Sequence, residues 1–326
     1  MAAKTGNYAV LEAIQFEMRK SPHLSIFCER SGGSDPFAVS QLGQVIDLKK
    51  EFGLLRVLDG PIDEEWQVGG AIGMAMTGTP AIAYVPGMCT LRAFELVFNQ
   101  AGKWRYMTGG QTNLPLVIWQ VGMGRNPGLA AQHADAGQEV LYASIPGLRV
   151  VVPSNPYDAK GLMTAALRNG DPVAFFHYGA INAASVDVPD NDYVVPIGEA
   201  AVRQEGHDIT IVGIAAAQVE VMKAAKGLQA AGISAEIIDP RTLKPFPIEA
   251  VAKSVSKTRR LLVCDHGHET AGSAAEIIAL TAMACPGAKF ARCTFPDAPS
   301  PAAKEMILWM TPHAENVIGF AKKMLS

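Results

Sequence analysis

The stretch LRVVVPSNPYDAKGLMTAALRNGDPVAFFH, residues 148–177, decides the fold of this chain of 326 residues. Its two ends, LRVVVPS and PVAFFH, are continuous apolar runs of strand length, and the segment PYDAKGLMTAALRNG between them is long enough for a helix. Strands without polar alternation indicate a parallel sheet that is buried on both faces. A helix between two such strands is a right-handed crossover. The stretch therefore predicts a strand–helix–strand unit.

The same alternation of strands and helices continues on both sides of this stretch. Further strands are expected at 24–29, 54–60, 81–86, 114–120, 208–215, 234–240, 259–266 and 289–295. Further helices are expected at 1–20, 38–52, from Pro61 onward, and at 91–107, 218–232, 247–258 and 271–284. From Gly179 to Gly206 the chain is rich in Asp, Pro, Asn and Gly and has no helical period. We predict an α/β protein with two doubly wound parallel-sheet domains, residues 1–185 and 207–326, joined by a linker at 186–206.

Composition narrows the class of protein. The chain is 49% hydrophobic and 18% charged with a net charge of -3, which argues against disorder and gives no support for binding nucleic acid or a membrane surface. The N-terminus lacks the apolar run of a signal peptide, and no stretch approaches the 18 apolar residues of a membrane span. The 5 cysteines show no CxxC spacing, which is typical of reduced thiols. We expect a cytoplasmic protein.

The acidic group DGPIDEE, residues 59–65, follows a predicted strand and opens a predicted helix. Asp63, Glu64 and Glu65 could simply stabilise the positive end of the helix dipole. The run WQVGGAIGMAM that follows is apolar and small, so one of these carboxylates could instead be held at a buried position and exchange protons. The residues alone leave both interpretations open. Motifs of the forms GxxxxGK[ST] and GxSxG do not occur in the sequence.

Histidines at strand ends are the other candidates for chemistry. His133 lies in GLAAQHADAG, residues 128–137, with Asp135 two positions later. A lone loop histidine is more often a hydrogen-bonded surface residue than a catalyst. His266 and His268 follow a predicted strand, where α/β sheets place ligands, but the sequence offers no further metal ligands at a telling spacing.

Several segments together change these interpretations. DGPIDE, GGQTNLPLVIWQ, GLAAQH, PGLRVVVPSNPYDAKGL, IIDPRTLKPFP and FPDAPSPAA occur in this order. With them the chain resembles the beta subunit of the thiamine-diphosphate-dependent decarboxylating component of 2-oxoacid dehydrogenases, a family with pyruvate, branched-chain and acetoin members. The resemblance covers nearly the whole chain. It implies a first domain that binds the aminopyrimidine of the cofactor and a second that is similar to the C-terminal domain of transketolases.

The resemblance also implies site residues. Glu64 matches the glutamate that hydrogen-bonds the pyrimidine N1′ and favours the imino form, which takes the thiazolium C2 proton. His133 matches a histidine near the substrate carboxylate or the reacting adduct, where it could stabilise negative charge or transfer a proton. Glu29, Val85 and Cys89 are expected to line the cofactor.

Partners and ions follow from the same resemblance. The diphosphate and its Mg²⁺ are held in the family by an alpha subunit with a GDG…N motif, and this chain contains no GDG. An α₂β₂ heterotetramer is therefore expected, with a lipoyl acyltransferase as the partner that accepts the acyl group. Ala166, Asn169 and Asp171 match a region that binds a structural K⁺ in relatives, largely through backbone carbonyls.

The chain departs from the family pattern around the cofactor. Ala83 stands where an acid is usual, Val85 and Cys89 replace larger groups, and Trp66 and Gln67 replace a small residue and a phenylalanine. Further along, QHAD replaces QHSQ, and Asp265 stands where many relatives have histidine. Because Glu64 and His133 remain, these changes favour an altered substrate, not pyruvate, over a dead enzyme. Two alternatives stay open: a thiamine-dependent lyase or carboligase without a lipoyl partner, and a non-catalytic scaffold for the alpha subunit.

Overall fold

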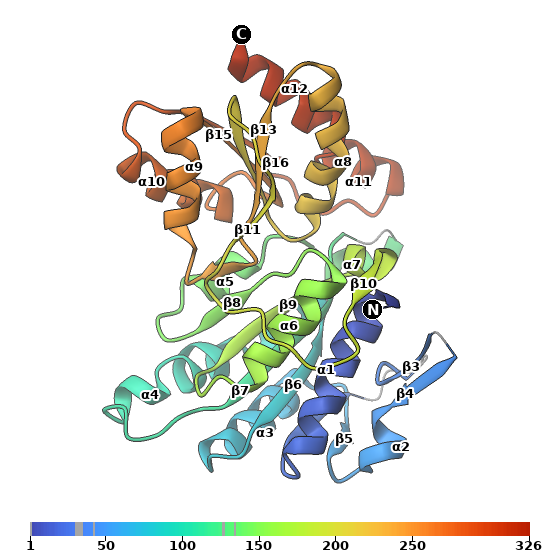
Figure 1. The fold of residues 1–326 in the computed structure, drawn as a ribbon. Coiled ribbons are helices and arrows are strands. Elements are labelled where there is room, and N and C mark those ends of the chain that lie inside the picture. The colour runs from blue at the N-terminus through green and yellow to red at the C-terminus, as the bar shows by residue number, and fades with distance from the viewer. Residues whose placement is uncertain (1, 30–34, 42, 126–127, 134) are drawn as a thin grey trace. The chain divides into compact units, whose positions relative to one another are not determined.

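Residues 148–177 form the predicted strand–helix–strand unit in the computed structural model of the chain (Figure 1). Its elements are β8 (Arg149–Val151), α6 (Pro156–Leu167) and β9 (Val173–Tyr178). Helix α6 starts cleanly because the Asn155 side chain accepts a hydrogen bond from the Asp158 amide at 2.9 Å and proline occupies the first turn. Every residue of β9 is buried, as a central parallel strand requires.

The structure describes residues 2–29, 35–41, 43–125, 128–133 and 135–326. Their contacts group into two compact units, of which the first comprises 1–123 and 141–197 and the second comprises 124–140 and 198–326. The boundary after Ile197 lies within the segment predicted as a linker. The segment 124–140, which carries His133, packs with the second unit. Among the helices of the described ranges, none is both long enough and apolar enough to cross a membrane.

The first unit is built around a parallel sheet in the order β8-β9-β7-β6-β2-β5. Chain connections that step toward β8 and those that step toward β5 must cross on opposite faces if all crossovers are right-handed. Helix α3 connects β5 to β6, a step toward β8, whereas α6 connects β8 to β9, a step toward β5. The two helices therefore lie on opposite faces of the sheet, and α1 packs beside α6 (Figure 1). The remaining elements of this unit are β1 (Ala2–Thr5), α1 (Gly6–Lys20), β2 (Ser25–Glu29), β3 (Ala38–Gln41), β4 (Gln44–Asp47), α2 (Leu48–Phe52), β5 (Val57–Gly60), α3 (Glu64–Met76), β6 (Ala81–Pro86), η1 (Gly87–Ala93), η2 (Leu96–Ala101), α4 (Trp104–Met107), β7 (Leu116–Met123), α5 (Glu139–Ala143, which the chain enters from the second unit), α7 (Gly179–Ala183) and β10 (Ser185–Val188).

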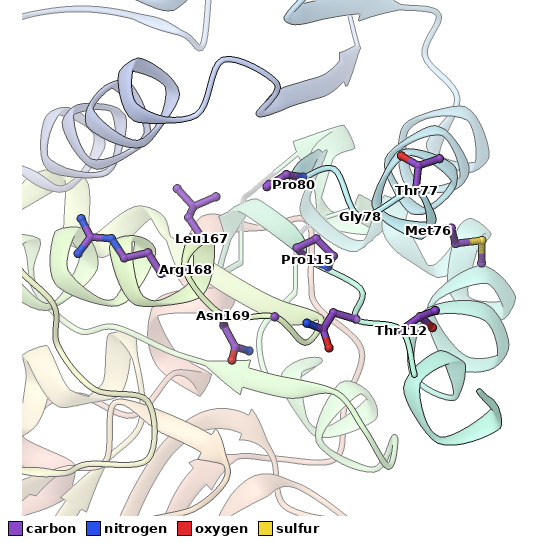
Figure 2. Close-up of a pocket in the computed structure, with 11 residues that line it drawn as sticks. Met76, Thr77, Gly78, Pro80, Thr112, Pro115, Leu167, Arg168 and Asn169 are labelled. Atoms are coloured by element: carbon purple, nitrogen blue, oxygen red, sulfur yellow. The ribbon is translucent and has the colours of Figure 1, made fainter. Parts of the chain in front are cut away.

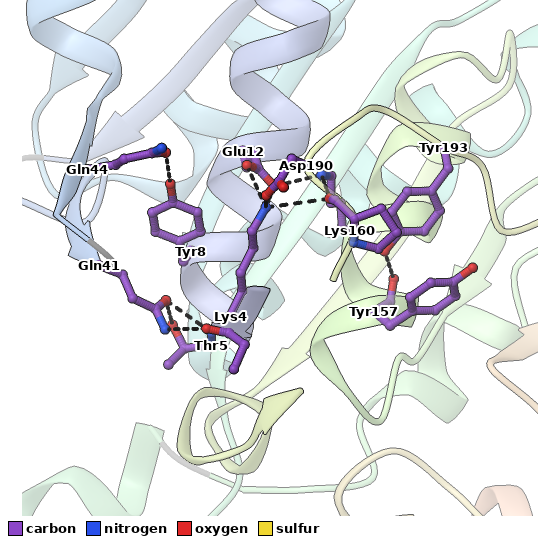
Figure 3. A network of polar contacts seen from close by, with 12 residues as sticks. Lys4, Thr5, Tyr8, Glu12, Gln41, Gln44, Tyr157, Lys160, Asp190 and Tyr193 are labelled. Atoms are coloured by element: carbon purple, nitrogen blue, oxygen red, sulfur yellow. Dashed lines mark hydrogen bonds and ion pairs between the residues drawn. The ribbon is translucent and has the colours of Figure 1, made fainter. Parts of the chain in front are cut away.

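A buried ionic network joins α1 to α6 in this unit (Figure 3). Both carboxylate oxygens of Glu12 accept hydrogen bonds from Lys4 Nζ at 2.8 Å, and one of them also accepts from Lys160 Nζ at 2.6 Å. The two ammonium groups also contact the 189–190 segment, where Lys160 donates to the Pro189 carbonyl at 2.6 Å and Lys4 pairs with Asp190 at 2.9 Å. Charges this deeply buried persist only because each has a partner.

The predicted helix at 38–52 is wrong for residues 38–47 and present only at 48–52. This stretch forms an antiparallel hairpin of β3 and β4, followed by the single turn α2. The branched side chains of Val39, Val45 and Ile46 favour extended backbone, and Gly43 adopts a φ of 72° in the described part of the turn. Apolar residues seven positions apart fit a helical face as well as a hairpin, so their spacing did not separate the two.

The predicted helix at 91–107 is present as three short helical segments: the 3₁₀ segment η1, the π-helical turn η2 and the short helix α4. Within these segments, Val97 and Ala101 are fully buried, whereas Phe94 and Trp104 are half-buried. The region is therefore helical, as predicted, although the helix is not continuous.

The second unit has the sheet order β11-β13-β12-β15-β16, in which only β11 is antiparallel to its neighbour among the described strands. Helices α9 and α10 cover one face of this sheet, and α8 and α12 cover the other (Figure 1). The protein is therefore the predicted α/β fold with two doubly wound, mostly parallel sheets. The elements are η3 (Gly128–His133), β11 (Ala201–Gln204), β12 (Ile209–Gly213), α8 (Ala216–Ala230), β13 (Ala235–Asp239), β14 (Thr242–Lys244), α9 (Ile248–Thr258), β15 (Arg260–His268), α10 (Ser273–Ala284), β16 (Lys289–Phe295), α11 (Lys304–Met310) and α12 (Ala314–Leu325).

Candidate functional site

The first sheet has a topological switch point between β2 and β6. The chain leaves β2 toward β5 and leaves the adjacent strand β6 toward β7, in opposite directions. A crevice outside the carboxyl ends of two such strands is where open α/β sheets bind ligands. Glu29 is the last residue of β2, and Val85 lies at the end of β6. The topology therefore places two of the predicted cofactor-lining residues at this crevice.

The three acids at the start of α3 have different roles. The Asp63 side chain caps the helix, accepting hydrogen bonds from the amides of Glu65 at 3.0 Å and Trp66 at 3.4 Å. Glu65 is exposed, whereas Glu64 is only 5% exposed. The cap is thus supplied by Asp63, and the helix start does not explain why the Glu64 carboxylate is buried.

Glu64, Glu29 and Cys89 lie close enough to influence one another. Burial and then the charge of Glu64 raise the pKa of Glu29. Burial, followed by the charge of Glu64 and a hydrogen bond with it, raises the pKa of the Cys89 thiol to about 11. The Cys89 sulfhydryl is therefore a neutral donor toward the Glu64 carboxylate. The structure brings together the three polar residues that the sequence assigned to this site, and we call them the acidic cluster.

Polar side chains continue from this crevice along the same face of the sheet. Val85 is fully buried and stands directly beside Gln120 of β7 in the parallel register. The hydroxyl of Tyr142 faces both Gln120 and Thr90, and burial raises the pKa of Tyr142 beyond its ordinary value. Sequence reasoning missed Thr90, Gln120 and Tyr142 because single polar residues within apolar runs give no signal of their own.

Gln67 lies one turn after Glu64, on the same side of α3. It is fully buried, yet neither its Oε1 nor its Nε2 has a hydrogen-bond partner among the residues that the structure describes. Buried amides are rarely left unpaired, so such a group calls for a bound molecule or water. Gln67 was noted in the sequence as a departure from the family, and its unpaired amide gives that departure a physical meaning.

The aromatic side chains of Trp66 and Tyr84 pack against other residues of the first unit. The ring of Trp66 lies over Gly60, where a Cβ atom would come within 2.3 Å of it, and 5.6 Å from the ring of Phe27. The ring of Tyr84 packs edge-on against Phe37 at 4.9 Å and against Trp119 at 5.2 Å. The Trp66 ring therefore packs against residues of the first unit and stays half-buried.

His133 is the last residue of η3 in the second unit, and it is exposed. Two residues later, Asp135 pairs with Arg125 at 2.9 Å and with His268 at 3.4 Å. Asp265, another departure from the family pattern, lies three residues before His268. It is buried and accepts a hydrogen bond from the Gly267 amide at 2.8 Å. Sequence reasoning named Asp135 and His268 separately but missed their pairing, and it missed Arg125.

Asn169 and Asp171, predicted at a K⁺ site with Ala166, lie at the amino end of β9. The Asp171 carboxylate pairs with Arg105 at 2.6 Å and with Arg149 at 3.5 Å. The Ala166 carbonyl accepts the Asn169 amide at 3.2 Å. A cation here would therefore depend on backbone carbonyls, and the K⁺ site stays a prediction. Among the described residues, no group of three or more His, Cys, Asp or Glu side chains could hold a metal ion.

A cavity of about 530 Å³ adjoins this region (Figure 2). Pro80, Pro115 and Asn169 line it, and each precedes a strand of the first sheet. Because these strands are parallel, the cavity lies at the amino ends of the strands, opposite the edge that carries Glu29 and Val85. It is therefore separate from the acidic cluster.

Comparison with known proteins agrees with this geometry. Residues 4–178 match the transketolase pyrimidine binding domain, and residues 198–317 match the transketolase C-terminal domain. Over 98% of both chains the fold is similar to a split gene transketolase, described as an inactive beta4 tetramer, with a TM-score of 0.79 at 20% identity. The chain is thus a transketolase-type α/β protein.

Curated relatives define the family more closely. The chain is 34% identical to the acetoin:2,6-dichlorophenolindophenol oxidoreductase subunit beta of Bacillus subtilis, over 97% of this chain and 96% of the relative. It is 33% identical to the pyruvate dehydrogenase E1 component subunit beta of the same organism, over 100% and 99% of the two chains. The chain belongs to the family of pyruvate dehydrogenase E1 and acetoin oxidoreductase beta subunits.

Proposed function

We propose that this chain is the subunit that activates thiamine diphosphate in an α₂β₂ enzyme of the 2-oxoacid dehydrogenase type, with Glu64 as the essential carboxylate. The observation that carries this proposal is the buried Glu64 in the acidic cluster at the first switch point. A buried anionic acceptor fits a ring nitrogen that gains a proton, and the apolar part of α3 behind it excludes water. When bound, the cofactor supplies an acidic carbon and an electron sink beside a substrate carbonyl.

Each candidate residue of this chain would have a separate role at the cofactor or the substrate. Glu64 would hold the proton at the pyrimidine nitrogen, and the neutral Cys89 thiol and the Glu29 carboxyl would fix its position. Val85 would line the pyrimidine. His133 would serve the substrate side by stabilising developing negative charge or moving a proton. An alpha subunit would hold the diphosphate and Mg²⁺, and K⁺ bound at Ala166, Asn169 and Asp171 would be structural. The assembly would act in the cytoplasm.

For the substrate, we propose a 2-oxoacid or an acyloin other than pyruvate, with a hydrogen-bonding group that meets Gln67. The acetoin and pyruvate relatives are almost equally similar to this chain, so identity does not choose between them. An unpaired amide donor and acceptor beside Glu64 favour a substrate with a hydroxyl or a second carbonyl. The acyl group would pass to a lipoyl carrier. In the alternative lyase or carboligase, no such carrier is needed.

The test is turnover by the complex that co-purifies with the tagged chain. Glu64→Gln should lower kcat by roughly 100-fold or more and leave assembly unchanged, because general acid–base groups contribute about that much. Glu65→Gln is the matched control, since Glu65 is the adjacent exposed acid of the same helix turn. A non-catalytic scaffold would tolerate both substitutions equally.

A substrate panel with and without a lipoyl acceptor separates the remaining possibilities. We expect acetoin or another hydroxyl-bearing or dicarbonyl substrate to have the highest kcat/KM, with activity that depends on the lipoyl carrier. Product formation without the carrier would support the lyase or carboligase. Pyruvate as clearly the best substrate would contradict the proposed substrate class.

A further inference from the structure

The second sheet has its own switch point, and a segment of the same unit lies against one of its strands. The chain leaves β12 toward β13 and leaves the adjacent strand β15 toward β16. Gly137 meets Gly267, at the end of β15, backbone to backbone, and a Cβ atom at 137 would lie 2.4 Å from the Gly267 Cα. The Gly128 amide donates to the Ala302 carbonyl at 2.8 Å. The segment that carries His133 is therefore docked where other α/β sheets bind a ligand.

Arg125 anchors the start of this segment. Its side chain is 3% exposed, and its guanidinium lies 3.4 Å from the centroid of the Phe295 ring. Nη1 donates to the His266 carbonyl at 2.6 Å, and Nη2 pairs with Asp135 Oδ1 at 2.9 Å. A guanidinium buried this deeply needs a counter-charge, and Asp135 supplies it.

Asp135 anchors the end of the segment through both its side chain and its backbone. Its Oδ2 faces His268 Nε2 at 3.4 Å, and its Oδ1 accepts the Ala136 amide at 2.8 Å. Its carbonyl accepts the Gly124 amide at 3.1 Å, which closes the segment into a loop. His268 Nδ1 lies 3.1 Å from the Pro296 carbonyl, so each ring nitrogen of His268 faces an oxygen atom.

We propose that Arg125, Asp135 and His268, which we call the clasp, are positioning residues that hold His133 where the reaction needs it. This inference rests on the proposed function, because it takes His133 as the substrate-side residue. Asp135 sits two residues from His133 and is bonded to both Arg125 and His268. It thereby fixes the segment two residues after His133. The clasp also explains why an aspartate stands at this position.

The test substitutes Asp135→Asn, which keeps the shape of the side chain and removes its charge. The matched control is Asp208→Asn, which removes a carboxylate on the same unit that accepts the Ser234 amide at 2.8 Å. In the isolated chain, hydrogen exchange followed by mass spectrometry should show peptides from 124–137 exchanging about tenfold faster or more in D135N and unchanged in D208N.

In the co-purified complex, D135N should lower kcat by about 10–100-fold, because a misplacement of about 1 Å has that effect. Cofactor affinity should be unchanged, and Asp135→Glu, which keeps the charge, should restore part of the lost kcat. Unchanged exchange in D135N would overturn the inference. Faster exchange with an unchanged kcat would overturn the positioning role. If the wild-type complex shows no thiamine-dependent turnover while D135N still accelerates exchange, the proposed function fails and the clasp is confirmed as a structural device.

Discussion

Gln67→Met tests the claim that the Gln67 amide awaits a ligand. In the described structure neither polar atom of this fully buried side chain has a partner, and an unpaired buried polar group costs about 1–3 kcal/mol. Methionine has a similar length and volume and no amide, so the substitution should remove this cost without leaving a cavity. The isolated chain should gain about 1–3 kcal/mol, which raises Tm by roughly 2–12 °C for a unit of this size.

Differential scanning calorimetry of the isolated chain measures the gain, and Gln218→Met is the matched control. Gln218 is also buried, and its amide also has no partner among the described residues, but it lies on α8 in the second unit. Both variants should therefore gain stability. Only Q67M should lose kcat/KM in the assembled enzyme, by about 10–100-fold for the preferred substrate. A lower Tm in Q67M, or an unchanged kcat/KM, would refute the assignment of Gln67 to the ligand.

Three further predictions concern stability. Glu12→Gln leaves Lys4 and Lys160 without their shared buried carboxylate. The substitution should lower the free energy of unfolding by about 3–5 kcal/mol and Tm by roughly 6–20 °C. A change in Tm of less than about 2 °C would contradict the buried network. Burial lowers the pKa of His177 to about 4, so the unfolded chain takes up this proton first and stability is lost as pH falls from about 6.5 toward 4. His177→Gln should make this part of the Tm–pH curve shallower, and an equally steep curve would count against it. Burial raises the pKa of Glu29, so the protonated carboxyl favours the folded state, and this stabilisation is lost as pH rises through that pKa. Glu29→Gln should therefore raise Tm at pH 8 more than at pH 4.

Much of the fold could be predicted because the parallel strands are continuous apolar runs. β6 occupies 81–86, as predicted, and β16 occupies 289–295. The hairpin at 38–47 could not be predicted, because Val39 and Ile46 are spaced to fit one face of a helix equally well. Its true state depends on Gly43 and on tertiary packing, which override local periodicity.

The candidate site, like the fold, could be predicted from the sequence only in part. The position of Glu64 followed from the order of motifs along the chain, and its burial agrees with that role. The pairing of Asp135 with His268 joins residues far apart in sequence, and no local pattern contains it. The unpaired amide of Gln67 is equally invisible in sequence, since only the packed structure shows which buried groups lack a partner.

The central claim is that Glu64 activates the cofactor, and it can be measured without knowing the substrate. The rate at which the C2 proton of bound thiamine diphosphate exchanges with D₂O reports this activation directly, by quenched-flow NMR on the co-purified complex. With bound cofactor at equal occupancy, Glu64→Gln should slow this exchange by roughly 100-fold or more, and Glu65→Gln should leave it unchanged. Exchange at the wild-type rate in E64Q would contradict the account.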